Sequence, residues 1–283
     1  MTTHLSLHTL LCAMAVRRFL RSTVPWDDLE GLGLELCERY GREQVRIEFL
    51  EADNWLSVPM VVDDEWFVKV VSDQHSRLHA LFTAGRNLGA FSAGVPGFFE
   101  HFGTPYSMAE HELTATSRLR DIGLNVPTPV EAFEYEGYGV VVLEYLAGFR
   151  TLDEVAVTEA ERLAPDLFQA LSRMHGAGLA HGDLRAENVL VVDGALYFID
   201  ATSVADTDVA AENARGYDVA CALGALTPLV GARVAVEAAL TAYTAEEVLA
   251  AGEFLDFVSL RPDLVFDVGR LKGEIEKAVS RAG

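Results

Sequence analysis

HGDLRAENVLVVDGALYFID, residues 181–200, is the stretch that decides the fold. Two short apolar runs flank Asp193-Gly194 within it. An Asp-Gly pair between apolar runs is the strongest short-range signal for a β-hairpin, because both residues tolerate the positive φ angles of a tight turn. The stretch therefore predicts a buried hairpin directly after a polar loop.

Three polar residues lie at the edges of this hairpin: Asp183, Asn188 and Asp200. Two carboxylates and a carboxamide could hold a hydroxyl, a divalent cation and the phosphates of a nucleotide close together. The alternative is that each is an ordinary turn residue, since Asp and Asn are frequent in turns. Their combination on one hairpin favours a Mg²⁺ and phosphate site.

Length and composition indicate a globular chain with two lobes or domains. The chain has 283 residues, 50% of them hydrophobic, with 15 Phe, which excludes a disordered protein. Its formal charge is −21, and its only lysines are Lys69, Lys272 and Lys277. Concentrated salt screens the self-repulsion of such an acidic surface, so we expect a halophilic protein, from an archaeon. The charge also argues against a surface that binds nucleic acid.

The cysteines and the N-terminal segment bear on location. Cys12, Cys37 and Cys221 are distant and odd in number, so neither a disulfide framework nor a metal cluster is predicted, which is typical of a cytoplasmic protein. Residues 5–16 are apolar but too few to span a bilayer. The arginines follow this run instead of preceding it, unlike a secretory signal. We expect an amphipathic helix that packs on the first lobe, with a membrane anchor as the alternative.

The pattern of apolar residues predicts three regions. Residues 1–43 form a helical extension, with helices up to residue 21 and over 26–40. Residues 44–147 form a small sheet with one main helix and a long Gly-rich connection over 72–105, whereas residues 148–283 are mainly helical apart from the central hairpin. The expected strands cover 45–49, 66–71, 130–135 and 139–145, and the main helices 107–122 and 158–176. Such an α+β chain has two lobes with a ligand cleft at their junction.

Two details of these helices concern their ends. Thr158 and Glu161 have the spacing of a capping box at the start of helix 158–176. Pro165 either splits that helix or begins its main segment. His75 and His79, in the long connection, have helical spacing but lack a third ligand, so a metal site there is not expected.

Lys69 is the second decisive feature, because it is the only lysine in the first 271 residues and lies inside the apolar strand 66–71. It could be a surface lysine on an edge strand. It could instead place its charge on nucleotide phosphates, held by a carboxylate on the following helix. That helix offers Glu110 and Glu112, of which only one can face the sheet.

These features together resemble the protein-kinase superfamily and, within it, the RIO-type atypical kinases. That family shares an HGDLxxxN loop, seen here at 181–188, and a helix exit that matches Glu112, Gly123 and Pro127. The family also has a long insertion before the helix and an Ile-Asp followed by Ser-Val, as in residues 199–204. The resemblance covers about residues 44–225 and favours Glu112 over Glu110.

The resemblance implies a two-lobed kinase fold and a role for each matching residue. Lys69, paired with Glu112, would hold the α- and β-phosphates of ATP. Asp183 would orient or deprotonate the attacking hydroxyl, and Asn188 and Asp200 would ligate Mg²⁺.

Two further assignments follow from the resemblance. The backbone of the segment from Glu144 to Leu146 would pair with the adenine. Asp218 would hold the backbone of the catalytic loop, although it could also be an exposed aspartate at a helix start.

Departures from kinase patterns limit these roles. The phosphate-binding loop should lie near residues 51–59, yet residues 51–57 contain no glycine, so the side chains of Asn54 and Ser57 could substitute. Gly182 replaces the arginine that answers a phosphorylated activation loop in ordinary kinases. No Ala-Pro-Glu element follows Asp200, so switching by activation-loop phosphorylation is not expected.

Three functions remain open. The first is an ATP- and Mg²⁺-dependent serine/threonine kinase that acts on another protein or on itself, or an ATPase in which Asp200 takes the phosphate; the resemblance also implies association with the ribosome. The second is a small-molecule kinase of the aminoglycoside type, with an acidic pocket drawn from Glu237, Glu246, Glu247 and Asp256. The third is a nucleotide-binding scaffold without catalysis, a pseudokinase.

Overall fold

A computed structural model describes residues 24–50, 57–73, 103–201, 208–261 and 264–282. The described part of the chain divides into two compact units. The first contains the described residues up to 73 together with 103–113 and 130–145, and the second contains 114–129 and the residues from 146 onward. The expected helix up to residue 21, Asn54, the histidines at 75 and 79, and Ser203-Val204 lie outside the described residues.

The first unit contains a five-stranded sheet in the order β1-β2-β3-β5-β4. Its strands are β1 (Ile47–Phe49), β2 (Val58–Val62), β3 (Trp66–Val71), β4 (Pro129–Tyr135) and β5 (Tyr138–Glu144). The β1–β2, β2–β3 and β3–β5 pairs are antiparallel. Strand β2 was not predicted, because its five residues show no alternation and include Pro59, which disfavours a strand.

The two faces of this sheet pack against different helices. Val68 and Val70 of β3 join the apolar cluster that includes Leu32 and Leu36 of helix α2 (Trp26–Tyr40). Successive strand residues point to opposite faces. Lys69, between the two valines, therefore points to the other face.

Helix α4 (Pro105–Asp121) packs against that other face of the sheet. Val141 and Leu143 of β5 pack there against Ala109 of α4. The helix approaches the sheet so closely that a Cβ at Gly139 would lie 2.0 Å from the carbonyl oxygen of Pro105. Only glycine permits this contact, which brings the first turns of α4 onto β5.

Helix α2 has the bounds that the sequence predicts, and Gly41 ends it in the left-handed conformation with a φ of 63°. Polar contacts attach it to the sheet. Tyr40 and Arg39 donate hydrogen bonds to Glu131 at 2.7 and 3.0 Å, and Tyr138 donates to Asp28 at 2.5 Å.

The second unit contains the predicted hairpin, β7 (Val189–Val192) and β8 (Ala195–Phe198). Asp193 and Gly194 have φ angles of 50° and 76°, as the tight turn requires. Strand β6 (Arg150–Thr151) adds a third strand beside β7. It was not predicted, because two residues are too few for an alternating pattern.

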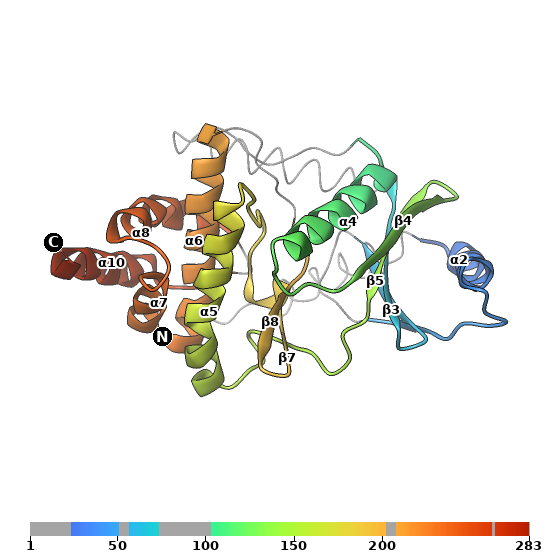
Figure 1. Cartoon of the computed structure of the whole chain (residues 1–283), viewed down its shortest axis with the longest axis horizontal. Helices are drawn as coiled ribbons and strands as arrows, with labels where there is room; N and C mark the ends of the chain where they lie inside the picture. The colour runs from blue at the N-terminus through green and yellow to red at the C-terminus, as the bar shows by residue number, and fades with distance from the viewer. Residues whose placement is uncertain (1–23, 51–56, 74–102, 202–207, 262–263, 283) are drawn as a thin grey trace, which may run out of the picture. The chain divides into compact units, whose positions relative to one another are not determined.

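Helices form the rest of the second unit. They are α5 (Val157–Gly176), α6 (Asp208–Val230), α7 (Ala232–Ala239), α8 (Ala245–Ala251), α9 (Leu255–Val258) and α10 (Val268–Ala282). Helices α5 and α6 run side by side, with α7, α8 and α10 on one side of this pair and the β7–β8 hairpin on the other (Figure 1). Leu163, Leu167 and Leu171 recur every four residues along α5 and are fully buried in the core.

Helix α5 corrects one expectation and settles another. It begins at Val157, and its N-cap Ala156 makes no side-chain hydrogen bond, so the capping box of Thr158 and Glu161 was wrong. Thr158 lies inside the first turn instead of at the cap. Pro165 lies within the helix without splitting it. In the described part of the chain, no helix combines the length and the hydropathy needed to cross a membrane.

Candidate functional site

The first group of site residues is an ion pair in the first unit. The ammonium Nζ of Lys69 donates to the carboxylate Oε2 of Glu112 at 2.9 Å, and the two side chains are 10% and 14% exposed. Lys69 lies opposite Val141 in the central strands of the sheet, on the face that α4 covers. The pairing with Glu112 instead of Glu110 is confirmed, because Glu110 is exposed on α4.

The second group lies in the second unit, on the loop before the hairpin. Asn188 is buried at the end of a 3₁₀ turn, and its amide nitrogen donates to the carbonyl oxygen of Asp183 at 2.8 Å. The backbone N–H of Ile199 donates to the carbonyl oxygen of Asn188 at 3.1 Å. These bonds join the loop to the end of β8, where Asp200 follows.

Asp200 has a φ of 57°, a conformation that residues other than glycine seldom adopt. The carboxamide of Asn188 and the carboxylate of Asp200 offer hard oxygen donors, which suit Mg²⁺, an ion that keeps several of its waters. The residues present therefore fit the ion that the sequence predicts. The described residues contain no group of three His, Cys, Asp or Glu that could hold a metal ion by themselves.

Asp218 of α6 holds the backbone of the loop that contains His181, Gly182 and Asp183. Its carboxylate, which is fully buried, accepts the N–H of His181 at 2.6 Å and the N–H of Gly182 at 2.9 Å. Gly182 has a φ of 79°, which explains a glycine at this position. The prediction that Asp218 supports the loop is confirmed, and the alternative of an exposed aspartate was wrong.

A buried chain of hydrogen bonds continues behind Asp218. The ring Nε2 of His175 lies 3.2 Å from the Asp218 carboxylate, and its Nδ1 lies 2.8 Å from the hydroxyl of Tyr243. A carboxylate only accepts, so Nε2 carries a proton and donates it to Asp218. Burial raises the pKa of Tyr243, which keeps that hydroxyl protonated. Nothing in the sequence signalled that Tyr243 belongs to this network.

His181 is completely buried beside the loop. Burial lowers its pKa, because the charged imidazolium loses hydration, although the negative charges of Asp218, Asp183 and Asp200 act in the opposite direction. Its Nδ1 accepts the backbone N–H of Asp183 at 3.4 Å. The imidazole of His181 is therefore neutral when it accepts this hydrogen bond from the loop backbone.

Two arginines surround the Asp183 carboxylate. Nη2 of Arg261, from the segment after α9, lies 3.0 Å from Oδ1, and Nη2 of Arg185 lies 3.9 Å from Oδ2. Arg185 also lies 3.3 Å from Glu187. Arg261 was not predicted, since it is far from Asp183 in the sequence and belongs to no motif.

The remaining predicted residues have less defined surroundings. Glu144 ends β5 with an exposed side chain, and Leu146 is half-buried after it. Ser57 is buried just before β2, and its hydroxyl makes no hydrogen bond within the described residues. Their contacts with ATP remain predictions, as does that of Asn54.

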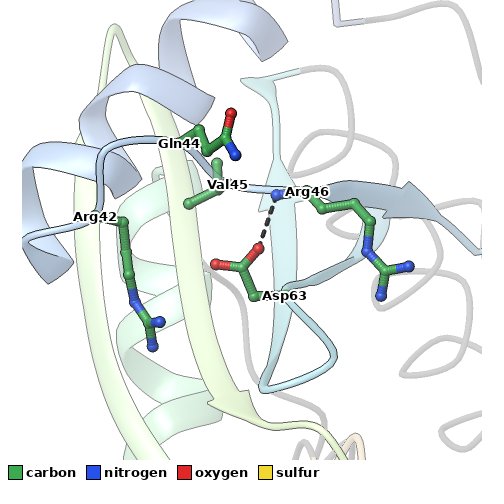
Figure 2. A pocket seen from close by; sticks show the side chains of 5 residues that line it. All are labelled: Arg42, Gln44, Val45, Arg46 and Asp63. Carbon is green, nitrogen blue, oxygen red and sulfur yellow. Dashed lines mark hydrogen bonds between the residues drawn. The ribbon is translucent and has the colours of Figure 1, made fainter.

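An open pocket of about 510 Å³ lies in the first unit near the start of β1. Figure 2 shows its lining residues, with Asp63 accepting the backbone N–H of Arg46 at 2.8 Å. Arg46 pairs with Asp64, and Arg42 pairs with Glu65 at 2.6 Å, so both arginines are already matched by acids. The pocket includes none of the predicted site residues.

Comparison with known proteins finds a family model that matches part of the chain. The model of the RIO domain matches residues 103–222, which include Glu112, the catalytic loop, the hairpin and Asp218. The chain is 31% identical over 87 residues to the KEOPS complex subunit Bud32 of Pyrococcus abyssi, covering 29% of this chain and 38% of that protein. It is 33% identical over 116 residues to the serine/threonine-protein kinase RIO1 of Chaetomium thermophilum, covering 35% and 22%. The match thus spans well under half of each relative.

A solved structure agrees with the fold. The GDP complex of aminoglycoside 2′-phosphotransferase-IIIa superposes with a TM-score of 0.51 at 12% identity, over 88% of this chain and 97% of that one. This likeness concerns the fold alone. It confirms the α+β kinase-like architecture, with a small sheet in one unit and mainly helices in the other.

Proposed function

We propose that this chain, whose residues 103–222 match the model of the RIO domain, is an ATP- and Mg²⁺-dependent serine/threonine kinase or ATPase of the RIO type. The family supports a phosphotransferase, and the finer activity is our proposal. The geometry of the loop at residues 181–188 is the observation that supports this proposal. Asp218 holds the backbone at His181 and Gly182, while the Asn188 amide donates to the carbonyl of Asp183. A loop fixed at both ends suits a reaction that depends on positioning and on charge.

Each residue has a proposed task. Lys69, held by Glu112 at 2.9 Å, places its charge on the α- and β-phosphates. Asp183 orients the acceptor hydroxyl and accepts its proton. Asn188 and Asp200 hold Mg²⁺, which when bound neutralises charge on the phosphates.

The acceptor is either a protein hydroxyl or the chain itself, with hydrolysis through Asp200 as a variant. A small-molecule acceptor is less well supported, because three of the four acids that could line its pocket have local partners. Glu237 lies 3.8 Å from Arg233, Glu247 caps α8 through Thr244, and Asp256 lies 2.6 Å from Lys272. These contacts account for the acids without a cationic ligand.

Labelled ATP separates the candidate functions. The purified chain in concentrated potassium chloride is given Mg²⁺ and ATP labelled at the γ-phosphate. Label on the protein supports kinase activity, free phosphate supports the ATPase, and label on an added aminoglycoside or sugar supports a small-molecule kinase. Bound nucleotide without any turnover indicates a scaffold and overturns the proposal.

Substitutions test the site residues in the same assay. Lys69→Ala and Asp200→Ala should each reduce turnover at least about 100-fold, as expected when stabilisation of transition-state charge is removed. Lys272→Ala is the control, since that lysine pairs with Asp256 on the surface and should leave turnover unchanged. Turnover that survives Lys69→Ala or Asp200→Ala contradicts the site assignment.

We also propose a cytoplasmic protein that acts with a protein partner in a salt-rich cell. The relative named as a KEOPS complex subunit supports a partner, whereas association with the ribosome remains a prediction from the family. The charge of −21 supports adaptation to salt. Circular dichroism during dialysis into low salt tests this adaptation: we expect unfolding, and a chain that keeps its fold refutes it.

A further inference from the structure

Arg261 reaches the candidate catalytic aspartate from a distant part of the sequence. Its Nη2 lies 3.0 Å from Oδ1 of Asp183, with the arginine side chain 9% exposed and the aspartate side chain 16% exposed. Arg261 follows α9, outside the residues 103–222 that the family model matches. Burial to this degree distinguishes the contact from an ordinary surface ion pair.

Helix α6 fixes the guanidinium in place. The other terminal nitrogen, Nη1, donates to the hydroxyl of Tyr217 at 3.1 Å and lies 3.8 Å from the Sγ of Cys221. Both partners are fully buried. Burial raises the pKa of the Cys221 thiol to about 12, so the sulfur is neutral and does not compete with Asp183 for the positive charge.

Adjacent residues of α6 thus support two parts of one loop. Asp218 holds the backbone at His181 and Gly182, while Tyr217 anchors the arginine that contacts the Asp183 side chain. One turn of α6 therefore positions both the backbone of the loop, through Asp218, and the carboxylate of Asp183, through Tyr217 and Arg261.

We propose that Arg261 is a positioning residue that fixes the carboxylate of Asp183 for phosphoryl transfer. This inference rests on the proposed function. The contact at 3.0 Å holds Oδ1 of Asp183 against a guanidinium that Tyr217 of α6 also binds. Contact with one oxygen also limits rotation of the carboxylate, which reduces the number of unproductive orientations.

Kinetics of Arg261 variants test this role. Arg261→Ala should lower kcat about 10- to 100-fold and change KM for ATP less than about twofold, because the arginine acts on Asp183 and not on the nucleotide. Arg261→Lys should recover part of kcat, since it keeps the charge and loses the planar fork. Arg233→Ala, which removes an exposed arginine–glutamate pair at 3.8 Å, is the matched control and should equal the wild type.

Chemical rescue separates positioning from a structural effect. Free guanidinium, added at millimolar concentration, should raise kcat of Arg261→Ala severalfold and leave Arg233→Ala unchanged. An Arg261→Ala variant that is as fast as the wild type overturns the inference while the proposed function stands. A variant that is faster than the wild type also overturns it, because Arg261 would then inhibit Asp183 instead of holding it in a productive orientation.

A double-mutant cycle tests the pair without relying on turnover. Thermal unfolding is measured for Arg261→Ala, Asp183→Asn and the double variant. We expect the double variant to lose less in melting temperature than the sum of the single losses. Additive losses overturn the inference. An inactive wild type refutes the proposed function separately, and the cycle then still decides whether Arg261 is coupled to Asp183.

Discussion

Two buried ion pairs of nearly equal length serve the two groups of site residues in opposite ways. Lys69 and Glu112 meet at 2.9 Å, and Arg261 and Asp183 meet at 3.0 Å. In the first pair the cation is the group proposed to bind the phosphates of ATP, and the carboxylate supports it. In the second the carboxylate is the proposed reacting group and the cation supports it.

The support behind the two pairs also differs. Lys69 lies on a central strand, and its partner comes from the helix packed on the same face of the sheet, so regular secondary structure positions both. Asp183 lies on a loop, where no regular series of backbone hydrogen bonds fixes its position. Its position depends on Asp218, Tyr217 and Arg261, three side chains from later parts of the chain. A loop site therefore needs buried polar partners that a strand site does not.

The largest effect that this comparison predicts comes from removing Asp218. Asp218→Ala leaves two buried backbone N–H groups and the Nε2–H of His175 without their acceptor, and each such group costs about 1–3 kcal/mol. We expect the free energy of unfolding to fall by about 4 kcal/mol in a denaturant titration, together with loss of turnover. Asp218→Asn keeps one acceptor oxygen and should lose roughly half as much. If Asp218→Ala unfolds like the wild type, the loop does not depend on its buried support.

A smaller effect is expected in the strand-based pair. Glu112→Gln keeps an oxygen that accepts from Lys69 and loses the charge, so kcat/KM for ATP should fall about tenfold, or about 1.4 kcal/mol, with little change in stability. Glu110→Gln, two residues earlier and exposed on the same helix, is the matched control. Equal effects of the two substitutions would contradict the pairing that the structure shows.

The smallest expected effect is the pH dependence of the free energy of unfolding that comes from His181. Because burial lowers the pKa of His181, the unfolded chain binds a proton near pH 6.5 that the folded chain does not. Above that pH His181 is neutral in both states and does not affect the free energy of unfolding. As the pH falls below it, protonation of the unfolded chain lowers the free energy of unfolding, by less than about 1 kcal/mol between pH 7 and pH 6. His181→Asn should remove this part of the pH dependence in denaturant titrations. An unchanged pH profile would show that His181 titrates alike in both states.

Local sequence determined the elements on which these sites are built. Asp193-Gly194 specified the hairpin, since both residues accept the positive φ that its turn needs, and Gly41 ended α2 for the same reason. Lys69, the only lysine in the first 271 residues, was predicted from its place inside an apolar strand to act on nucleotide phosphates, and the structure buries it. The spacing of the motifs, together with the family resemblance, was enough to choose Glu112.

Only the tertiary structure decided which distant residues complete the loop. Arg261 and Tyr243 belong to no motif, and their role depends on how α6 and the chain after it pack around residues 181–183. Strands β2 and β6 likewise exist because neighbouring strands pair with them, and neither carries a periodic pattern of its own. The turn at Asp193-Gly194 and the end of α2 at Gly41 are set by the preferences of a few adjacent residues, so the sequence determined them. A buried charge needs partners that only the folded chain brings within hydrogen-bonding distance, so the support of Asp183 was decided by the packing.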